Sequence, residues 1–322
     1  MACVGLMFAL VSGTASAAVV LRAADAHPPD YPTAQAVTFM GILLEQRSDK
    51  RYRIQLFSSR QLGEENETIE QTRSGAIDIN CVNLASFNDV IPDSLALTLP
   101  FLFSSVEHMH RVLDSDIGDG VLKAFERHGL IGLAFYDSGT RSFYTRFKPI
   151  RALQDFKGQK LRVQQSRLFL DLVTALGAQG VVLPYGQVKT ALETGLVDGA
   201  ENNWPSYESS EHYAVARYYT LTEHSMSPEV LLMSKVRWDK LSRADRALIR
   251  SSARESAVHM RELWRAREEE ARKKVIDAGV TVITLPAEEK RNLVEKARAI
   301  HNQHAKNARL GALVESIRQM AR

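Results

Sequence analysis

The order of strand-like and helix-like segments constrains the fold of this chain more than any other feature. An apolar run of strand length spans residues 18–25 and stops at a histidine and two prolines, and apolar side chains then recur at helical spacing over 31–48. A strand pattern at 50–59, a helix pattern with an acidic first turn at 63–75 and a strand pattern at 76–84 follow. This alternation predicts an α/β domain built on a largely parallel sheet.

The same alternation returns in the middle of the chain. A strand-like run at 128–137 is followed by strand, helix, strand, helix and strand patterns between residues 159 and 204. Residues 227–241 have strand character, and we expect them to return to the first unit. The sequence therefore predicts two α/β lobes with a cleft between them. The predicted lobes are residues 18–141 plus 225–255, and residues 142–224 plus 256–322.

One uninterrupted helix is expected to cross both lobes. Residues 243–278 contain neither glycine nor proline, Ser242 and Asp245 fit a capping box, and Gly279 fits a helix stop. At about 1.5 Å per residue, such a helix is about 54 Å long, which is enough to lie across two lobes.

The composition and the motifs exclude several classes of protein. The net charge is only +3, from 41 basic and 38 acidic residues, and we expect no nucleic-acid partner. The chain has no P-loop, G-x-S-x-G, H-E-x-x-H or G-x-G-x-x-G motif, so we expect no catalytic residue and no cofactor. Residues 114–126 resemble a calcium loop but carry Asp119 and Phe125 where glycine and glutamate belong. His108 and His110 are a poor ligand pair and are expected at the surface, so no metal site is predicted.

The N-terminus resembles a secretory signal peptide. Residues 4–11 are apolar and a small-x-small pattern ends at Ala17, which predicts cleavage near Ala17 and a signal peptide over residues 1–17. The basic residues that usually open such a segment are absent, and a buried strand is the alternative. No other run approaches the roughly 18 apolar residues that span a bilayer, so we expect an exported, soluble protein. Cys3 would leave with the signal, and Cys81 is expected to be a buried small hydrophobe without a disulfide.

Polar residues gather at the ends of the predicted strands, where ligands bind in open α/β sheets. The candidates are His27, residues 81–83, residues 137–141, Arg162, Gln164, Gln165, Tyr185 and residues 201–204. Arg162 stands out because Leu161 and Val163 are apolar, and strand alternation puts its guanidinium on the opposite face. Such a guanidinium is solvated, paired with an internal carboxylate, or available to bind an external acid. Trp204 could stack on a sugar ring or belong to the core.

Six segments resemble a known family. They read QLGEENETIEQTRSGAIDI, LPFLF, SGTRSFY, DFKGQKLRVQQS, ALGAQGVVLPYGQVKTALETGLVDGAENN and LTEHSMSPEVLLMSK. Together they resemble the substrate-binding proteins of tripartite ATP-independent periplasmic (TRAP) transporters, from about residue 20 to about residue 285. The resemblance implies a two-lobed periplasmic binding protein fold, a periplasmic location, and small and large permease subunits as partners. It also implies a monomeric receptor that binds its ligand without chemistry.

The same resemblance assigns candidate ligand contacts. It implies that Arg162 forms a bidentate salt bridge with a ligand carboxylate, that Asn202 contacts the ligand, and that Arg141 is a second anchor. Glu65 is expected to reach the cleft. His27, Asn83 and Gln164 stand where family members commonly touch the ligand.

The segments RVQQS, FYDSGTRSFY and AENNWPSYESSEHY resemble members that bind sugar acids, especially the hexuronates glucuronate and galacturonate. That subgroup is expected to carry an arginine where this chain has Cys81, which would shift the preference to a smaller or less hydroxylated acid if that arginine touches the ligand. Other acids, namely C4-dicarboxylates, keto acids, aromatic acids and aldonic acids, are alternatives. A secreted enzyme with Glu65 and Glu201 as an acid/base pair, and a sensory receptor, are alternative functions.

Overall fold

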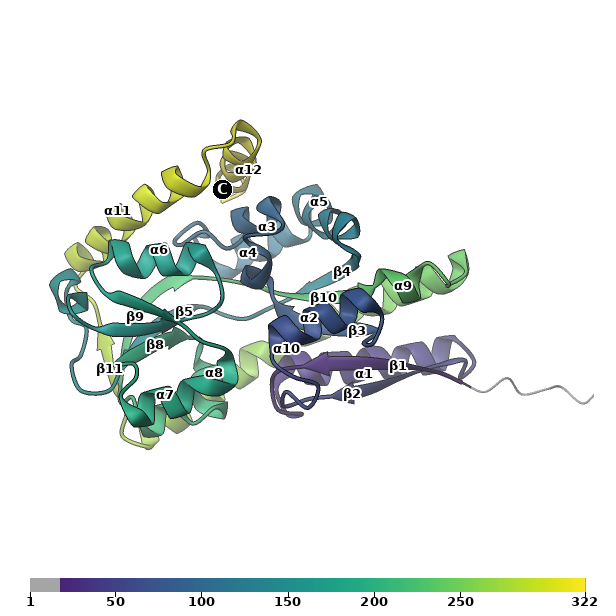
Figure 1. Cartoon of the computed structure of the whole chain (residues 1–322), viewed down its shortest axis with the longest axis horizontal. Helices are drawn as coiled ribbons and strands as arrows, with labels where there is room; N and C mark the ends of the chain where they lie inside the picture. Colours follow the sequence, from purple (N-terminus) through teal and green to yellow (C-terminus); the bar gives the residue numbers. More distant parts are fainter. Residues whose placement is uncertain (1–17, 322) are drawn as a thin grey trace, which may run out of the picture.

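The computed structural model describes residues 18–321, so the predicted signal peptide and its cleavage site lie outside the described residues. Two sheets form the framework of the molecule (Figure 1). The first has the strand order β2-β1-β3-β10-β4, with β1 parallel to β2 and β3, and β10 antiparallel to β3 and β4. Its strands are β1 (Val19–Asp25), β2 (Tyr52–Phe57), β3 (Ile79–Asn83), β4 (Leu130–Tyr136) and β10 (Glu229–Ser234).

The second sheet has the order β11-β9-β5-β8-β6-β7 and is mixed, because β5 runs antiparallel to β8 and β9 while β6 is parallel to β7 and β8. Its strands are β5 (Arg141–Thr145), β6 (Lys160–Val163), β7 (Gln179–Val182), β8 (Gly199–Asn202), β9 (Tyr218–Ser225) and β11 (Thr281–Thr284). The predicted two-lobed α/β fold is confirmed.

Helices flank both sheets (Figure 1). They are α1 (Pro32–Arg47), α2 (Glu65–Ser74), α3 (Pro92–Ala96), α4 (Val106–Leu113), α5 (Asp116–Ala124), α6 (Arg167–Ala175), α7 (Val188–Thr194), α8 (Trp204–Ser209), α9 (Lys235–Trp238), α10 (Arg243–Asp277), α11 (Ala287–His304) and α12 (Ala308–Gln319). The predicted return strand is shorter than expected, because β10 ends at Ser234 and α9 follows. The segment that resembles a calcium loop is mostly the helix α5, and residues 18–321 contain no cluster of His, Cys, Asp and Glu suited to a metal ion.

The long helix α10 crosses both lobes as predicted. The Ser242 hydroxyl accepts a hydrogen bond from the Asp245 amide at 3.1 Å and so caps its start. The helix packs against α1 and β4 beside the first sheet and against α8 beside the second. Within residues 18–321, no helix has the length and apolar character needed to cross a membrane.

Besides the passage through α10 from β10 to β11, the chain passes between the sheets from β4 to β5 and from β9 to β10. Gly139 lies in the first crossing with φ +57°, and a Cβ there would come within 2.8 Å of the Trp264 ring on α10. Only glycine combines that backbone conformation with so close an approach to the helix. The crossing is therefore packed tightly against α10, which contacts both lobes.

The C-terminal helices connect the two lobes on another side. α11 contacts α6 beside the second sheet, and α12 contacts α3 beside the first (Figure 1). The sequence prediction grouped residues 256–322 with the second lobe, and the lobe boundaries remain a prediction. The surface position expected for His108 was wrong, since its buried ring lies 2.8 Å from the Ile317 carbonyl of α12. This burial depends on the return of a helix more than 200 residues away in the sequence.

Candidate ligand-binding cleft

A small cleft opens where the carboxyl ends of strands from both sheets face each other. Its lining residues are Ala26, His27, Glu65, Asn83, Ser138, Arg141, Arg162, Gln164, Tyr185, Asn202, Ser206 and Glu229. All seven ligand contacts implied by the family resemblance are among them, so the fold brings these residues together around one space. Their contact with a ligand remains a prediction.

Arg162 lies on β6 with its guanidinium in the cleft and only 3% of its surface exposed. Leu161 and Val163 point into the core on the other face, as strand alternation predicts. The Arg162 Nε and Nη2 donate to the carbonyl of Leu183, at 2.9 and 2.7 Å. A guanidinium has five N–H donors, so three remain, and both Nη1 protons are among them.

No carboxylate of the described chain lies within ion-pair distance of Arg162. Burial disfavours its charge and lowers the pKa of Arg162, although the charge of nearby Glu201 acts in the opposite sense. A buried guanidinium in this position gains from an external anion. Of the three states that the sequence left open, the structure favours the third, an arginine available to bind an acid from outside the chain.

Arg141 is in a different state, because Glu201 neutralises it. Its Nε and Nη2 donate to the two carboxylate oxygens of Glu201 at 2.5 and 2.8 Å, and both residues are almost fully buried. Desolvation acts to lower the pKa of Arg141, but the charge and hydrogen bonds of Glu201 have the larger effect, so the net pKa of Arg141 is raised. Desolvation also opposes the charge of Glu201, yet Arg141 and His224 together lower its pKa to about 2. Glu201 is therefore a fixed carboxylate.

Glu65 reaches the cleft from the first turn of α2. One of its carboxylate oxygens accepts from the backbone N–H of Asn83 at 2.9 Å and the other from the Ser86 hydroxyl at 3.3 Å. Burial raises the pKa of Glu65, while the hydrogen bond from Asn83 and the charge of His27 partly counter it. Both oxygens thus have a partner inside the protein.

Asn83 ends β3, and its side chain is fully committed to its neighbours. The amide nitrogen donates to Glu229 at 3.1 Å and to the Ser227 carbonyl at 3.4 Å. The amide oxygen accepts from the Ala85 N–H and the Ser227 hydroxyl. Because an asparagine side chain offers two donors and two acceptor positions, Asn83 holds the cleft wall in place.

His27 follows β1, and its ring is fixed on two sides. Its Nδ1 lies 2.9 Å from Asp25, and the ring stacks on Tyr31 with 4.0 Å between centroids. Burial lowers the pKa of His27, but the hydrogen bond to Asp25 and the charges of the nearby carboxylates more than compensate, so the net pKa is raised. Nε2 is left as the ring nitrogen available to a ligand.

Gln164 and Asn202 place amide groups beside Arg162. The Gln164 Nε2 is buried and has no hydrogen-bond partner in the described part of the chain. The Asn202 side-chain oxygen accepts from the Asn203 N–H at 2.9 Å, which leaves the amide nitrogen as a donor. Trp204 instead stacks on Tyr219 at 3.7 Å within the core, so the core alternative for this tryptophan is the one observed.

Sequence reasoning missed Glu229, the first residue of β10. Because β10 runs antiparallel to its neighbours, its start lies beside the ends of β3 and β4, where Glu229 pairs with Asn83 and Tyr136. The signal in the sequence was an acidic residue that follows Pro228 and opens an otherwise apolar strand. Ala26 and Ser206 also line the cleft and were not singled out, whereas Ser138 belongs to the candidate range 137–141.

Cys81 is buried in the core beside α1 and α10, with 2% of its surface exposed, which confirms the expected small buried hydrophobe. Burial and the nearby carboxylates of Asp25 and Glu229 raise the pKa of its thiol well above the usual value. The thiol is therefore protonated, and Cys81 is not among the lining residues of the cleft.

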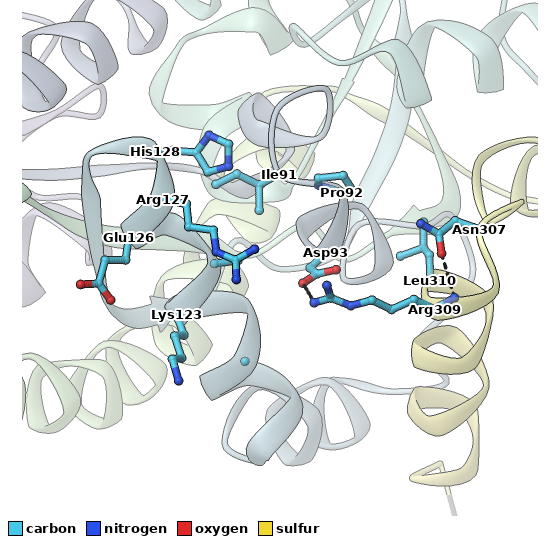
Figure 2. Close-up of a pocket in the computed structure, with 12 residues that line it drawn as sticks. Ile91, Pro92, Asp93, Lys123, Glu126, Arg127, His128, Asn307, Arg309 and Leu310 are labelled. Carbon is cyan, nitrogen blue, oxygen red and sulfur yellow. Dashed lines mark hydrogen bonds and ion pairs between the residues drawn. The ribbon is translucent and has the colours of Figure 1, made fainter.

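A wider hollow lies elsewhere, between α3, α5 and the start of α12 (Figure 2). Figure 2 shows an ion pair between Asp93 and Arg309 at 2.5 Å across it, and the Asn307 side chain accepting from the Arg309 N–H. Most of its charged side chains are exposed and of both signs, for example Lys123 and Glu126. It lacks the buried, unpaired groups that mark the cleft.

Two lobes joined by crossing segments, with a buried arginine free of internal acids between them, define a receptor that captures a small anion. Residues 23–307 match the family model described as bacterial extracellular solute-binding protein, family 7. The chain belongs to this family, which contains the substrate-binding proteins of TRAP transporters.

Solved structures and curated relatives agree with that assignment. A TRAP periplasmic solute-binding protein from Bradyrhizobium sp. BTAi1, in complex with D-galacturonate, is 48% identical, with a TM-score of 0.92 over 94% of this chain and 100% of that one. A counterpart from Pseudomonas putida F1 with bound D-glucuronate is 36% identical, with a TM-score of 0.89 over 93% and 96% of the two chains. A solute-binding protein of Chromohalobacter salexigens is 36% identical over 87% of this chain and 84% of its own.

Proposed function

We propose that this protein captures a hexuronate, D-galacturonate or D-glucuronate, in the cleft and delivers it to a TRAP permease. The observation that carries the proposal is Arg162, a buried guanidinium with three free N–H donors and no internal acid. The uronates bound by the Bradyrhizobium and Pseudomonas proteins support the choice of ligand.

In this proposal the ligand carboxylate binds the edge of Arg162 formed by Nη1 and Nη2, which can supply two parallel hydrogen bonds. Asn202 and Gln164 add amide donors beside it. Glu65 and His27 contact the hydroxyl groups from the other side of the cleft. Arg141 contributes chiefly by fixing Glu201, while Asn83 fixes the opposite wall.

Ligand binding favours closure of the two lobes, because the residues that contact the ligand come from both sheets. The crossings from β4 to β5 and from β9 to β10 are the hinges. Leaving Arg162 buried without an acid costs several kcal/mol, so a neutral sugar of the same shape is disfavoured.

Binding proceeds without chemistry. The acid/base pair of Glu65 and Glu201 that the sequence offered for an enzyme is disfavoured, because Arg141 fixes Glu201 and its pKa is lowered to about 2. The protein then acts as a monomer without a cofactor. It is exported to the periplasm after cleavage near Ala17, and its partners are the small and large permease subunits.

Calorimetry and thermal unfolding with D-galacturonate, D-glucuronate and D-galactose test the proposal, since galactose lacks only the carboxylate of galacturonate. At a free concentration of 100 times its Kd, a uronate is expected to raise the free energy of unfolding by about 2.7 kcal/mol, and galactose is expected to have no effect. Mass spectrometry should recover the bound uronate unchanged. Equal stabilisation by galactose, or no response to either uronate, would contradict the proposal.

A further inference from the structure

Charge is divided between the two walls of the cleft. The arginines Arg141 and Arg162 come from strands of the second sheet, whereas Glu65 and Glu229 come from elements beside or within the first. Glu201 neutralises Arg141, so the second wall carries one uncompensated positive charge. A ligand that bridges the walls meets a cation at one end and carboxyl groups at the other.

Glu229 is the carboxyl group with an open position. Only 4% of its surface is exposed, and its Oε1 accepts from the Asn83 amide at 3.1 Å. Its Oε2 is buried and has no hydrogen-bond partner among residues 18–321. Because the side chain of Asn83 is saturated by its other contacts, Glu229 is held in position and does not need to move to meet a ligand.

The carboxyl groups next to Glu229 are already occupied. Asp25 binds His27 at 2.9 Å and the Thr33 hydroxyl at 2.7 Å, and both oxygens of Glu65 have partners. Burial and the charge of Glu65 raise the pKa of Glu229 to about 8, with His27 acting in the opposite direction. A ligand hydroxyl fits either protonation state, because it can donate to the carboxylate or accept from the carboxylic acid.

We propose that Glu229 selects acids with a single carboxylate: its free Oε2 hydrogen-bonds a ligand hydroxyl on the first-sheet wall, and a second carboxylate at that place is rejected. The inference rests on the proposed function and narrows it. Above the pKa of Glu229, about 8, a second carboxylate would lie against the ionised Glu229 and beside Glu65 in a desolvated site, where like charges are strongly disfavoured. Under those conditions the inference disfavours dicarboxylates among the alternative ligands.

The test compares three acids by calorimetry at pH 9, above the pKa of about 8 of Glu229, so that this carboxyl group is charged. D-galacturonate is the reference. Galactonate and galactarate are open-chain acids that differ from each other only at the end far from the first carboxylate, where galactonate has a hydroxymethyl group and galactarate has a second carboxylate. The wild-type protein is expected to bind galactarate at least about 100-fold more weakly than galacturonate. In Glu229→Gln, the ratio of the Kd for galactarate to the Kd for galacturonate is expected to fall at least tenfold. The control Glu255→Gln, which removes a surface carboxylate paired with Arg47, should leave the ratio unchanged.

Each result has a defined meaning. If Glu229→Gln binds galacturonate but keeps the wild-type ratio, Glu229 is not the selecting residue, while the proposed function stands. Equal binding of galactarate and galacturonate by the wild-type protein also overturns the inference alone. If galactonate binds as weakly as galactarate in every variant, the protein selects for the closed sugar ring and not against a second carboxylate, which also overturns the inference. A wild-type protein that binds none of the acids overturns both proposals. Thermal unfolding checks that each variant folds. If Glu229→Gln does not fold, Glu229→Asp replaces it, because the shorter side chain withdraws Oε2 but keeps the charge. Glu229→Asp should bind galacturonate more weakly than the wild-type protein does and should still reject galactarate.

Discussion

Replacing Arg162 by methionine is expected to abolish most ligand binding while changing the stability of the ligand-free protein little. The substitution removes the two charge-assisted hydrogen bonds proposed for the ligand carboxylate. At about 1.5 kcal/mol each, the low end for such bonds, their loss amounts to about 3 kcal/mol, or roughly a 100-fold rise in Kd. The variant also loses its bonds to the Leu183 carbonyl, but it no longer buries an unpaired charge, so the two effects on folding oppose each other.

Arg141→Met is the matched control, because this second arginine of the cleft is neutralised by the chain itself. Its removal leaves Glu201 as a buried carboxylate without its main partner, and breaking a buried pair in this way costs about 3–5 kcal/mol. We therefore expect Arg141→Met to lower the free energy of unfolding far more than Arg162→Met does.

Urea unfolding of the ligand-free variants and calorimetric titration with D-galacturonate measure the two quantities separately. The reasoning fails if folded Arg162→Met binds galacturonate with less than a tenfold loss of affinity. The reasoning fails as well if Arg162→Met destabilises the ligand-free protein as much as Arg141→Met does. Arg162 would then stabilise the fold through internal contacts as strongly as Arg141 does through Glu201.

Three further predictions follow from buried groups. The pKa of Glu229 is raised to about 8, so the folded protein keeps a proton that the unfolded chain releases near pH 4.5, and the ligand-free protein should lose stability as the pH rises from about 4.5 to 8. The raised pKa of His27 acts in the same direction. In Glu229→Gln, the melting temperature should therefore vary less between pH 5.5 and 8.5 than in the wild-type protein. Gly139→Ala should lower the free energy of unfolding by about 1–3 kcal/mol in urea, because alanine at φ +57° would clash with Trp264; an unchanged midpoint would contradict this. Cys81→Ala should leave the galacturonate affinity within about twofold, because Cys81 lies outside the cleft lining, and a larger change would mean that the thiol influences specificity.

Local patterns carried much of the prediction of this fold and cleft. Alternation along β6 was enough to turn Arg162 away from the core, and the capping residue Ser242 marked the start of α10. Both features depend on residues close together in the sequence, where periodicity and capping preferences are strong.

Features that depend on pairing over long distances were missed. The bond between Arg141 and Glu201, 60 residues apart, follows from the antiparallel register of β5 and β8. Glu229 reaches the cleft because β10 inserts between β3 and β4 with reversed direction, and no periodicity within the segment reveals that direction. The burial of His108 likewise depends on α12 packing beside α4.

The two hydrogen bonds from Arg162 to the Leu183 carbonyl affect when the conformational entropy of this side chain is lost. Leu183 follows β7, which is paired in parallel with β6, so the acceptor and the arginine belong to the same rigid sheet. A free arginine loses about 2 kcal/mol of rotamer entropy when it is immobilised. Here that loss occurs during folding, so an incoming anion meets a guanidinium that is already oriented.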